Sequence, residues 1–549
     1  MQAFFFALIS CIHNLFTAYI YPIKPKEALC MELIKDYIRL NSVMPTVTLR
    51  NVFEFDCIVP DNMPDVARIL AVEGTTFVEN VRMDNTFVVT DFIINYNVLY
   101  MSDNDESPVK AFNTIANHSL TGDIPTATRD ILLRAVSTVE NVEFTLINSR
   151  KLSIRASVRI DVKITNNMEQ GITTDIAQVP GIQILTNQEN ISICTENITS
   201  DCNISSNLEL PGVKQPFAKL LRSDPQVGDI NYTVTGDKMQ IRGNLSICTL
   251  YIADGGSKPL QIIENQIPFT HIVDVEVRDE SQCRTVDYAI KSFNIDIIED
   301  NDGVRRVLNV NSTVVFNIKS YTTEQINILE DAYALEADLQ LTKEEVSAAG
   351  NIEELTSTFV LKDVAGKDDT LPGIKEIVNV TCNPGIVEST CQDGAVLITG
   401  FVFCNVLYLT DDPEMPVATF NVKIPFEQLF EHRNSNSQMQ ANVNIDINHI
   451  SFGIISDNEI ELRISITARG IITTSISFNI VTDCVEVSDY EGENSVICCA
   501  PILLYIVQPG DSIWKIAKKY RTDPELLKKI NRLPEPYIIY PGQKLLISK

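Results

Sequence analysis

The sequence predicts a mainly β fold, in which three tandem antiparallel β-rich repeats precede a small βααβ domain. Apolar and polar residues alternate over long stretches, which is the pattern of half-buried strands. A Leu-Tyr-x-x-Asp motif occurs three times, and helical spacing appears near the C-terminus between two short apolar runs. With 549 residues, the chain is long enough for three or four domains that each bury a core.

The Leu-Tyr-x-x-Asp motif marks the repeats, because its copies are 151 and then 157 residues apart. The copies are Leu99-Tyr100 to Asp103, Leu250-Tyr251 to Asp254 and Leu407-Tyr408 to Asp411. A proline-led segment precedes each motif, at Pro64, Pro211 and Pro372, which lie 36, 40 and 36 residues before the tyrosine. Each repeat is therefore expected to begin as a short helix or turn after proline and to continue as strands.

Alternation is clearest over residues 88–100, 152–164 and 461–481, which predicts an antiparallel sheet or sandwich in each repeat. Residues 31–41 predict a short amphipathic helix. Residues 325–350 predict a partly helical connector, with the alternative that the first half of the 329–350 sequence is a strand. The acidic turns predict solvated hairpin turns. A calcium site is the alternative for them, although no Asp-x-Asp-x-Asp-Gly loop is present.

These patterns divide the chain into successive regions. The expected regions are an apolar N-terminal extension (1–30), the first repeat (31–168), the second repeat (180–324), the connector (325–350), the third repeat (351–483), a linker (484–502) and the C-terminal domain (503–549). Residues 3–20 suggest a signal peptide or anchor, but His13 and Asn14 interrupt the apolar run and no Lys or Arg precedes it. The favoured interpretation is that the natural start is Met31 rather than Met1, which makes residues 1–30 an upstream extension. No stable membrane span is expected.

The charge is strongly acidic overall and basic at the C-terminus. The formal charge is −28, but residues 504–549 hold nine Lys/Arg and four Asp/Glu, a net of +5. Nucleic acid is therefore not an expected partner of the acidic body. The 13 cysteines include no Cys-x-x-Cys pair, which predicts mostly buried, reduced thiols. Vicinal Cys498 and Cys499 are the exception, and their redox state stays open.

The repeats resemble the SPOCS domain, a former domain of unknown function from clostridia and related spore-forming bacteria. The resemblance rests on the proline-led start, the strands, the Leu-Tyr-x-x-Asp motif, and Ile-Pro-Phe at 267–269 and 424–426. It covers residues 31–483, and it is strong for the second and third copies and partial for the first. The resemblance implies a fold of three SPOCS-like units.

Residues 504–507 and 545–547 predict two short strands, with two helices between them. Asp511 is expected to cap the first helix, and Thr522 or Asp523 the second. The whole segment resembles a LysM domain. The residues that carry the resemblance are Tyr505, Val507, Gly510, Asp511, Ser512, Ile516, Ala517, Tyr520, Asn531, Pro541, Gly542, Gln543 and Ile547.

LysM domains bind N-acetylglucosamine polymers, such as peptidoglycan or chitin, in a groove between two loops. The resemblance implies that these loops are 510–513 and 533–540 here. The candidate ligand- or partner-binding residues are Gly510, Asp511, Ser512, Ile513, Trp514, Leu533, Tyr537, Ile538, Ile539 and Tyr540. Trp514 and Tyr537 are the candidate contact aromatics, with the alternative that Trp514 only packs on the helix surface. Pro534 and Pro536 depart from the polar residues common in the second loop, which counts against ordinary sugar binding.

SPOCS repeats joined to a LysM domain resemble clostridial spore-coat morphogenetic proteins. The resemblance implies a non-catalytic assembly protein in the mother-cell cytoplasm and then at the forespore surface. Its LysM module would bind the ATPase of the coat's basement layer, with other coat proteins as further partners. The alternative is a peptidoglycan-binding protein of the cell wall or cortex, which a genuine export signal in residues 1–30 would favour. No phosphate loop, His-Glu-x-x-His or Gly-x-Ser-x-Gly motif is present, so no catalytic residue, metal or cofactor is expected.

Overall fold

The structure is a computed structural model that describes residues 31–43, 46–84, 86–102, 108–123, 131–177, 181–255, 259–278, 282–487 and 502–548. The strands of the repeats are β1 Leu33–Val43, β2 Val47–Ile58, β3 Val66–Asp84, β4 Phe87–Ser102, β5 Val109–Asp123, β6 Ile131–Asn148, β7 Lys151–Ile176, β8 Ile182–Glu209, β9 Phe217–Thr235, β10 Lys238–Ala253, β11 Leu260–Asp274, β12 Cys283–Glu299, β13 Arg305–Ala334, β14 Asp338–Gly366, β15 Glu376–Gln392, β16 Ala395–Leu409, β17 Val417–Glu431, β18 Met439–Ile454 and β19 Glu459–Val487. The C-terminal elements are β20 Ile502–Ile506, α2 Ile513–Tyr520, α3 Pro524–Ile530 and β21 Lys544–Ser548. The predicted mainly β fold with a terminal βααβ unit is confirmed.

Each repeat is a sandwich of two antiparallel sheets. The middle three strands form a meander, in the orders β3-β4-β5, β9-β10-β11 and β15-β16-β17. The other sheet joins the first strand of the repeat to its last two, in the orders β8-β13-β12 and β14-β19-β18. In the first repeat, β7 pairs with β6 on one edge and with both β1 and β2 on the other. All three repeats therefore share one six-stranded plan, with the first strand of repeat one divided in two.

The buried face of each sandwich follows from the alternation in the sequence. Along β4, every second residue from Val88 to Tyr100 is buried, and β7 repeats the pattern from Leu152 to Ile164. These two faces meet in one apolar cluster, and equivalent clusters fill the second and third repeats. The period of two in the sequence therefore sets which side chains form each core.

The tyrosine and the leucine of the repeated motif point in opposite directions. Tyr100, Tyr251 and Tyr408 are fully buried within their own sandwiches. Their neighbours Leu99, Leu250 and Leu407 are also buried, but they meet one another in a central cluster formed by all three meander sheets. Adjacent residues of a strand face opposite sides of a sheet. The two-residue motif therefore serves the core of each repeat and the junction between repeats at once.

Each motif tyrosine fixes the segment that enters its meander. The tyrosine hydroxyl donates to the carbonyl oxygen of the residue 36 positions earlier, which is Pro64 at 3.0 Å, Gln215 at 3.2 Å and Pro372 at 3.0 Å. A backbone turn precedes this acceptor in each copy, at Pro60, Pro211 and Asp368. Pro211 is therefore equivalent to Pro60 rather than to Pro64. The unequal spacing of 40 residues in the second repeat reflects this, because Gln215 occupies the acceptor position.

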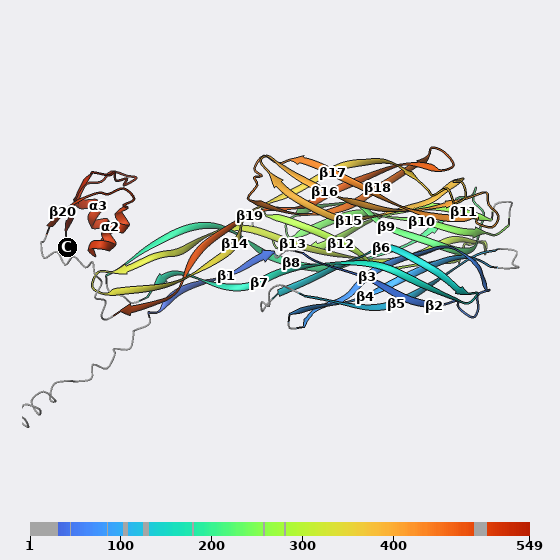
Figure 1. The fold of residues 1–549 in the computed structure, drawn as a ribbon, viewed down its shortest axis with the longest axis horizontal. Coiled ribbons are helices and arrows are strands. Elements are labelled where there is room, and N and C mark those ends of the chain that lie inside the picture. The colour runs from blue at the N-terminus through green and yellow to red at the C-terminus, as the bar shows by residue number, and fades with distance from the viewer. Residues whose placement is uncertain are drawn as a thin grey trace, which may run out of the picture.

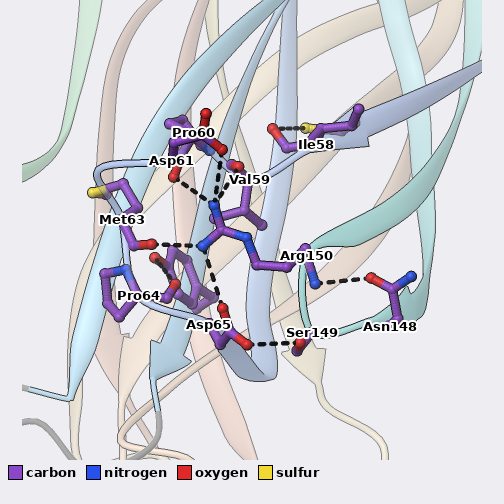
Figure 2. Close-up of polar contacts among 12 residues, drawn as sticks. Ile58, Val59, Pro60, Asp61, Met63, Pro64, Asp65, Asn148, Ser149 and Arg150 are labelled. Carbon is purple, nitrogen blue, oxygen red and sulfur yellow. Dashed lines mark hydrogen bonds and ion pairs between the residues drawn. The ribbon is translucent and has the colours of Figure 1, made fainter.

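A cation secures the same turn in each copy, and Figure 2 shows the first of them, Arg150. The guanidinium of Arg150 donates to the carbonyl oxygens of Val59, Pro60 and Met63 and lies 3.3 Å from the Asp65 carboxylate. Arg306 makes the equivalent contacts to Leu210, Pro211 and Lys214, and Lys367 to Asp368 and Leu371. The planar guanidinium group of arginine carries five N–H donors, so it can bind several carbonyl oxygens at the same time. Arg150 and Arg306 thereby tie their turns to the start of β7 and β13, whereas Lys367 belongs to the segment that it secures.

Beyond the three sandwiches, the longest strands continue as a three-ribbon stalk (Figure 1). Its ribbons are β1 with residues 165–176 of β7, residues 182–194 of β8 with 321–334 of β13, and residues 338–352 of β14 with 473–487 of β19. We call the rest of the repeats the head. Side chains from all three ribbons form the stalk core, among them Ile172, Ile191, Ile328 and Phe478. The three repeats therefore share a core in the stalk as well as in the head.

Two segments that were predicted to be helical are strands of the stalk. Residues 31–41 fall in β1, and residues 325–350 form the end of β13 and the start of β14. The alternative of a strand in the first half of residues 329–350 is therefore correct, whereas the helix is not. The Leu, Ala, Glu and Lys residues of these segments favour helix, but each segment pairs with a neighbouring strand, and Ile328, Ala332 and Ala348 are buried between ribbons. Tertiary pairing overrides so weak a preference. The predicted repeat limits at 168, 324, 351 and 483 all fall inside strands, because the strands of each repeat continue into the stalk.

The acidic turns make ordinary turn contacts where they are described. Asp411 pairs with Lys375, and the Asp412 carboxylate accepts from the backbone N–H of Glu414 at 2.9 Å. Within the described residues, no three His, Cys, Asp or Glu side chains are placed to hold a metal ion. Residues 103–107, residues 1–30 and the Cys498-Cys499 pair lie outside the described residues. Among the described helices, neither is long and apolar enough to cross a membrane.

Candidate functional site: the two loops and the stalk contact of the C-terminal domain

The C-terminal domain packs two helices on a two-stranded sheet. Its core contains Val507, Ile516, Ala517, Leu527, Leu545 and Ile547. The Asn531 side chain holds the edge of β21, because its oxygen accepts from the N–H of Leu546 at 2.6 Å and its nitrogen donates to the carbonyl of Leu546 at 2.7 Å. This core positions both predicted binding loops.

The first loop turns at Gly510, whose φ of 86° favours glycine. Ser512 caps α2, since its side chain accepts from the backbone N–H of Lys515 at 3.1 Å. Asp511 is therefore not the cap, and its carboxylate instead accepts from the Gln508 N–H at 2.8 Å and the Tyr505 hydroxyl at 2.7 Å. These hydrogen bonds hold the pKa of Asp511 below its usual range. Asp523 caps α3, as one of the two predicted alternatives.

The second loop divides into a buried and an exposed set. Leu533 and Ile539 pack on the domain core together with Ile513 of the first loop. Ile538 and Tyr540 are 56% and 66% exposed. Tyr537 donates to the Glu535 carboxylate at 3.0 Å, and the ammonium of Lys528 lies 4.6 Å from its ring centroid. The second loop therefore combines two exposed apolar side chains with an aromatic ring that a cation contacts, which suits a sugar face or a protein surface.

Trp514 faces the stalk rather than solvent. Its indole nitrogen donates to the Asp331 carboxylate at 2.8 Å, and its ring packs edge-on to Tyr333 at a centroid distance of 5.0 Å. Lys518 lies 2.6 Å from the same carboxylate, and the Tyr333 hydroxyl donates to the carbonyl of Thr522 at 2.7 Å. Of the two predicted contact aromatics, Trp514 is thus engaged with the stalk and Tyr537 with Glu535 and Lys528, while Tyr540 is the more exposed aromatic residue of the second loop.

We call this contact the stalk–LysM contact; it also includes an ion pair between Arg521 and Asp338. It places the C-terminal domain at the end of the stalk, far from the head (Figure 1). Sequence reasoning missed its stalk side, Asp331, Tyr333 and Asp338, because that segment was predicted as a connector with helical character. The apolar–polar alternation at Ile326, Asn327 and Ile328 was a signal that the strand continues past residue 324 towards this segment.

Comparisons with known proteins agree with the two resemblances. A family model of the LysM domain matches residues 505–548. A model described as SipL, SPOCS domain matches residues 216–298 and 373–455, which contain strands β9–β12 and β15–β18. The chain thus carries two matched SPOCS segments and a C-terminal LysM domain. The first repeat has the same strand order as the two matched repeats.

Curated relatives share only a short segment with this chain. Over 45 residues it is 51% identical to the SpoIVD-associated factor A of Bacillus subtilis (strain 168) and to the spore coat assembly protein ExsA of Bacillus cereus. These alignments cover 8% of this chain and 12% and 7% of the two relatives. The chain therefore covers only a small part of each relative's length. No solved structure matches the chain significantly.

Proposed function

We propose that this SPOCS-repeat protein with a C-terminal LysM domain is a non-catalytic spore-coat assembly protein. Its LysM domain recruits the acidic head to the ATPase of the coat's basement layer, in the mother-cell cytoplasm and then at the forespore surface. The proposal rests on one observation: the same chain contains matched SPOCS segments and a LysM domain. The stalk holds this LysM domain away from the head. The names of both curated relatives, one coat-assembly and one SpoIVD-associated, support this process.

The proposed partner surface is the exposed part of the second loop. Ile538 and Tyr540 supply apolar contact area, and exposed Lys529 and Arg532 supply positive charge on the same domain. Apolar anchors beside cations are typical of protein interfaces, and the charges steer an acidic partner. Trp514 does not belong to this surface, because it is committed to the stalk–LysM contact.

Binding of the full chain to the basement-layer ATPase and, in parallel, to purified peptidoglycan tests the proposal. Ile538→Asp and Tyr540→Ala are each expected to weaken ATPase binding about tenfold or more, as loss of an interface anchor does. Leu429→Asp is the matched control, because Leu429 is a similarly exposed apolar residue on the head. An unchanged ATPase affinity in both loop variants would contradict the assignment of the surface.

Peptidoglycan binding is the second candidate function, and the LysM match over residues 505–548 favours it. The ring of Tyr540 could stack on a sugar face, and the backbone of the loops could bond the acetamide. Binding of the full chain to peptidoglycan, weakened by Tyr540→Ala and with no binding to the ATPase, would replace the assembly role with a wall- or cortex-bound one.

A further inference from the structure

A polar cavity lies where the head meets the stalk, and all three repeats line it. Its volume is about 70 Å³, several times what a single water molecule requires. Its charged lining is Lys163 from the first repeat, Arg284, Asp287 and Lys319 from the second, and Glu354, Asp446 and Arg469 from the third. We call it the inter-repeat cavity. Charged side chains from all three repeats converge on it, whereas the central cluster and the stalk core, which also join the repeats, are apolar.

The carboxylates of the cavity are largely committed to other partners. Asp287 accepts from Arg134 at 2.6 Å and from the Asn444 amide at 2.6 Å. Glu354 accepts from the Tyr232 hydroxyl at 2.9 Å. Asp446 lies 3.3 Å from Arg469, yet burial raises its pKa to about 6, so it holds its negative charge less firmly than an ordinary aspartate. These three groups therefore do not offset the cations fully.

The cations of the cavity outnumber the carboxylates. Lys163, Arg284, Lys319 and Arg469 line it, against three carboxylates, and Arg134 stands behind Asp287 as a fifth cation. Burial lowers the pKa of Lys319, and Arg134 and Lys163 add to this effect, although Cys194 and Asp287 oppose it. Like charges so close together inside a protein repel each other, and an anion would relieve that repulsion.

Arg284 supplies an independent observation that points to a ligand, because it carries a buried donor with no partner. Its side chain is only 9% exposed. One terminal nitrogen donates to the Gln282 side chain at 2.5 Å, but the Nε–H is buried and has no hydrogen-bond partner in the structure. A buried donor of a charged group is costly to leave unpaired, and native proteins rarely do so. The cavity is the space that this side chain lines.

We propose that the inter-repeat cavity binds a small oxyanion of the phosphate or sulfate type, which links the three repeats. Guanidinium groups match the oxygens of such an anion in pairs, and ammonium groups add point charges. Amide and hydroxyl side chains, including Asn442 and Tyr321, line the same space and complete the set of polar partners. The anion stabilises the joined repeats because it binds only when all three are assembled. The site lies outside the LysM domain, so it does not rest on the proposed function.

Titration of inorganic phosphate into the full chain, at constant ionic strength with chloride, tests the site. Saturable binding by calorimetry is expected, together with a higher midpoint of thermal unfolding in phosphate than in chloride. Sulfate is expected to compete with phosphate. Arg284→Gln should weaken phosphate binding about tenfold or more, which is the effect of losing a charged hydrogen-bond donor.

Arg463→Gln is the matched control, because Arg463 is an exposed arginine of β19 that pairs with Glu461 outside the cavity. It should leave phosphate affinity unchanged. Lys163→Gln removes a cation of the first repeat and provides a second variant if Arg284→Gln does not unfold cooperatively. Absence of saturable binding to the folded chain at millimolar phosphate overturns the proposal. An affinity that the folded cavity variants leave unchanged also overturns it, because the anion would then bind elsewhere.

Discussion

The indole of Trp514 and the carboxylate of Asp331 are hydrogen-bonded at 2.8 Å, although 183 residues separate them in the chain. The bond joins α2 of the LysM domain to the end of β13 in the stalk, and Lys518 binds the same carboxylate. Trp514 is the single tryptophan of the sequence. Its fluorescence therefore reports directly on whether the LysM domain is held against the stalk.

The stalk–LysM contact is expected to open in acid. Burial raises the pKa of Asp331, but the hydrogen bonds and charge of Lys518 and the bond from Trp514 outweigh it, so the net pKa is lowered. A lowered pKa stabilises the contact fully above the ordinary aspartate value of about 3.9, and this contribution is lost as the pH falls through the lowered value. Tryptophan emission should therefore change below about pH 3.9.

Asp331→Asn is the control for this transition. The variant should show altered Trp514 emission already at neutral pH and no further acid step, because no carboxylate remains to be protonated. Far-ultraviolet circular dichroism, followed in parallel, separates opening of the contact from unfolding of the sheets. An acid step of the same size in Asp331→Asn would assign the titration to another group.

The motif tyrosines are expected to contribute through their hydroxyls as well as their rings. Tyr408→Phe leaves the partly buried carbonyl of Pro372 without its donor and should lower the free energy of unfolding by about 1–3 kcal/mol. Tyr37→Phe, at a residue that is 67% exposed, should have no measurable effect. Urea denaturation measures both. Equal midpoints for Tyr408→Phe and the unaltered chain would show that the hydroxyl contact adds no stability.

The motif leucines are expected to couple the repeats. Leu250→Ala opens space in the central cluster shared by the three meander sheets and should cost about 2–5 kcal/mol. The loss falls between repeats rather than within one, so calorimetric unfolding should broaden or divide into separate transitions. Leu429→Ala, at an exposed position, is the control and should keep the transition of the unaltered chain. A uniform shift without broadening in Leu250→Ala would mean that the repeats unfold as one unit regardless of this cluster.

Buried thiols are expected to resist alkylation in the folded chain. Burial raises the pKa of Cys57 to about 11 and that of Cys248 to about 12. A hydrogen bond with Cys404, whose sulfur is 2.8 Å away on the paired strand, and then burial raise the pKa of Cys382 well above its usual value. The thiolate is the reactive form. Iodoacetamide labelling read by peptide mass spectrometry should therefore modify these cysteines only after unfolding, and rapid labelling of Cys248 in the folded chain would contradict this.

The sequence predicted the head better than the stalk. Strand alternation such as that from Leu152 to Ile164 reports directly on a two-sided sheet, and the helical spacing of Ile513, Ile516 and Tyr520 reports on a helix. The stalk ribbons could not be predicted in the same way. Their residues, such as Ala332 and Ala348, are small or helix-favouring, and they are strands only because three separate ribbons bury them.

The candidate site was predicted in part. The LysM pattern located both loops and the βααβ order, because those features are local in the sequence. The direction of Trp514 depends on Asp331 and Tyr333, and the inter-repeat cavity depends on residues such as Lys163 and Arg469 that are 306 positions apart. No single-sequence pattern joins positions so distant, so these features required the structure.

The length of β13 sets a scale for the whole molecule. At about 3.3 Å per residue, its 30 residues extend roughly 100 Å from the end of the head to the tip that carries the LysM domain. The strand is braced by β8 along its full course, so this span is a fixed separation rather than a variable tether. A partner bound to the far end of the head and a partner bound to the LysM domain would therefore be kept a constant distance apart.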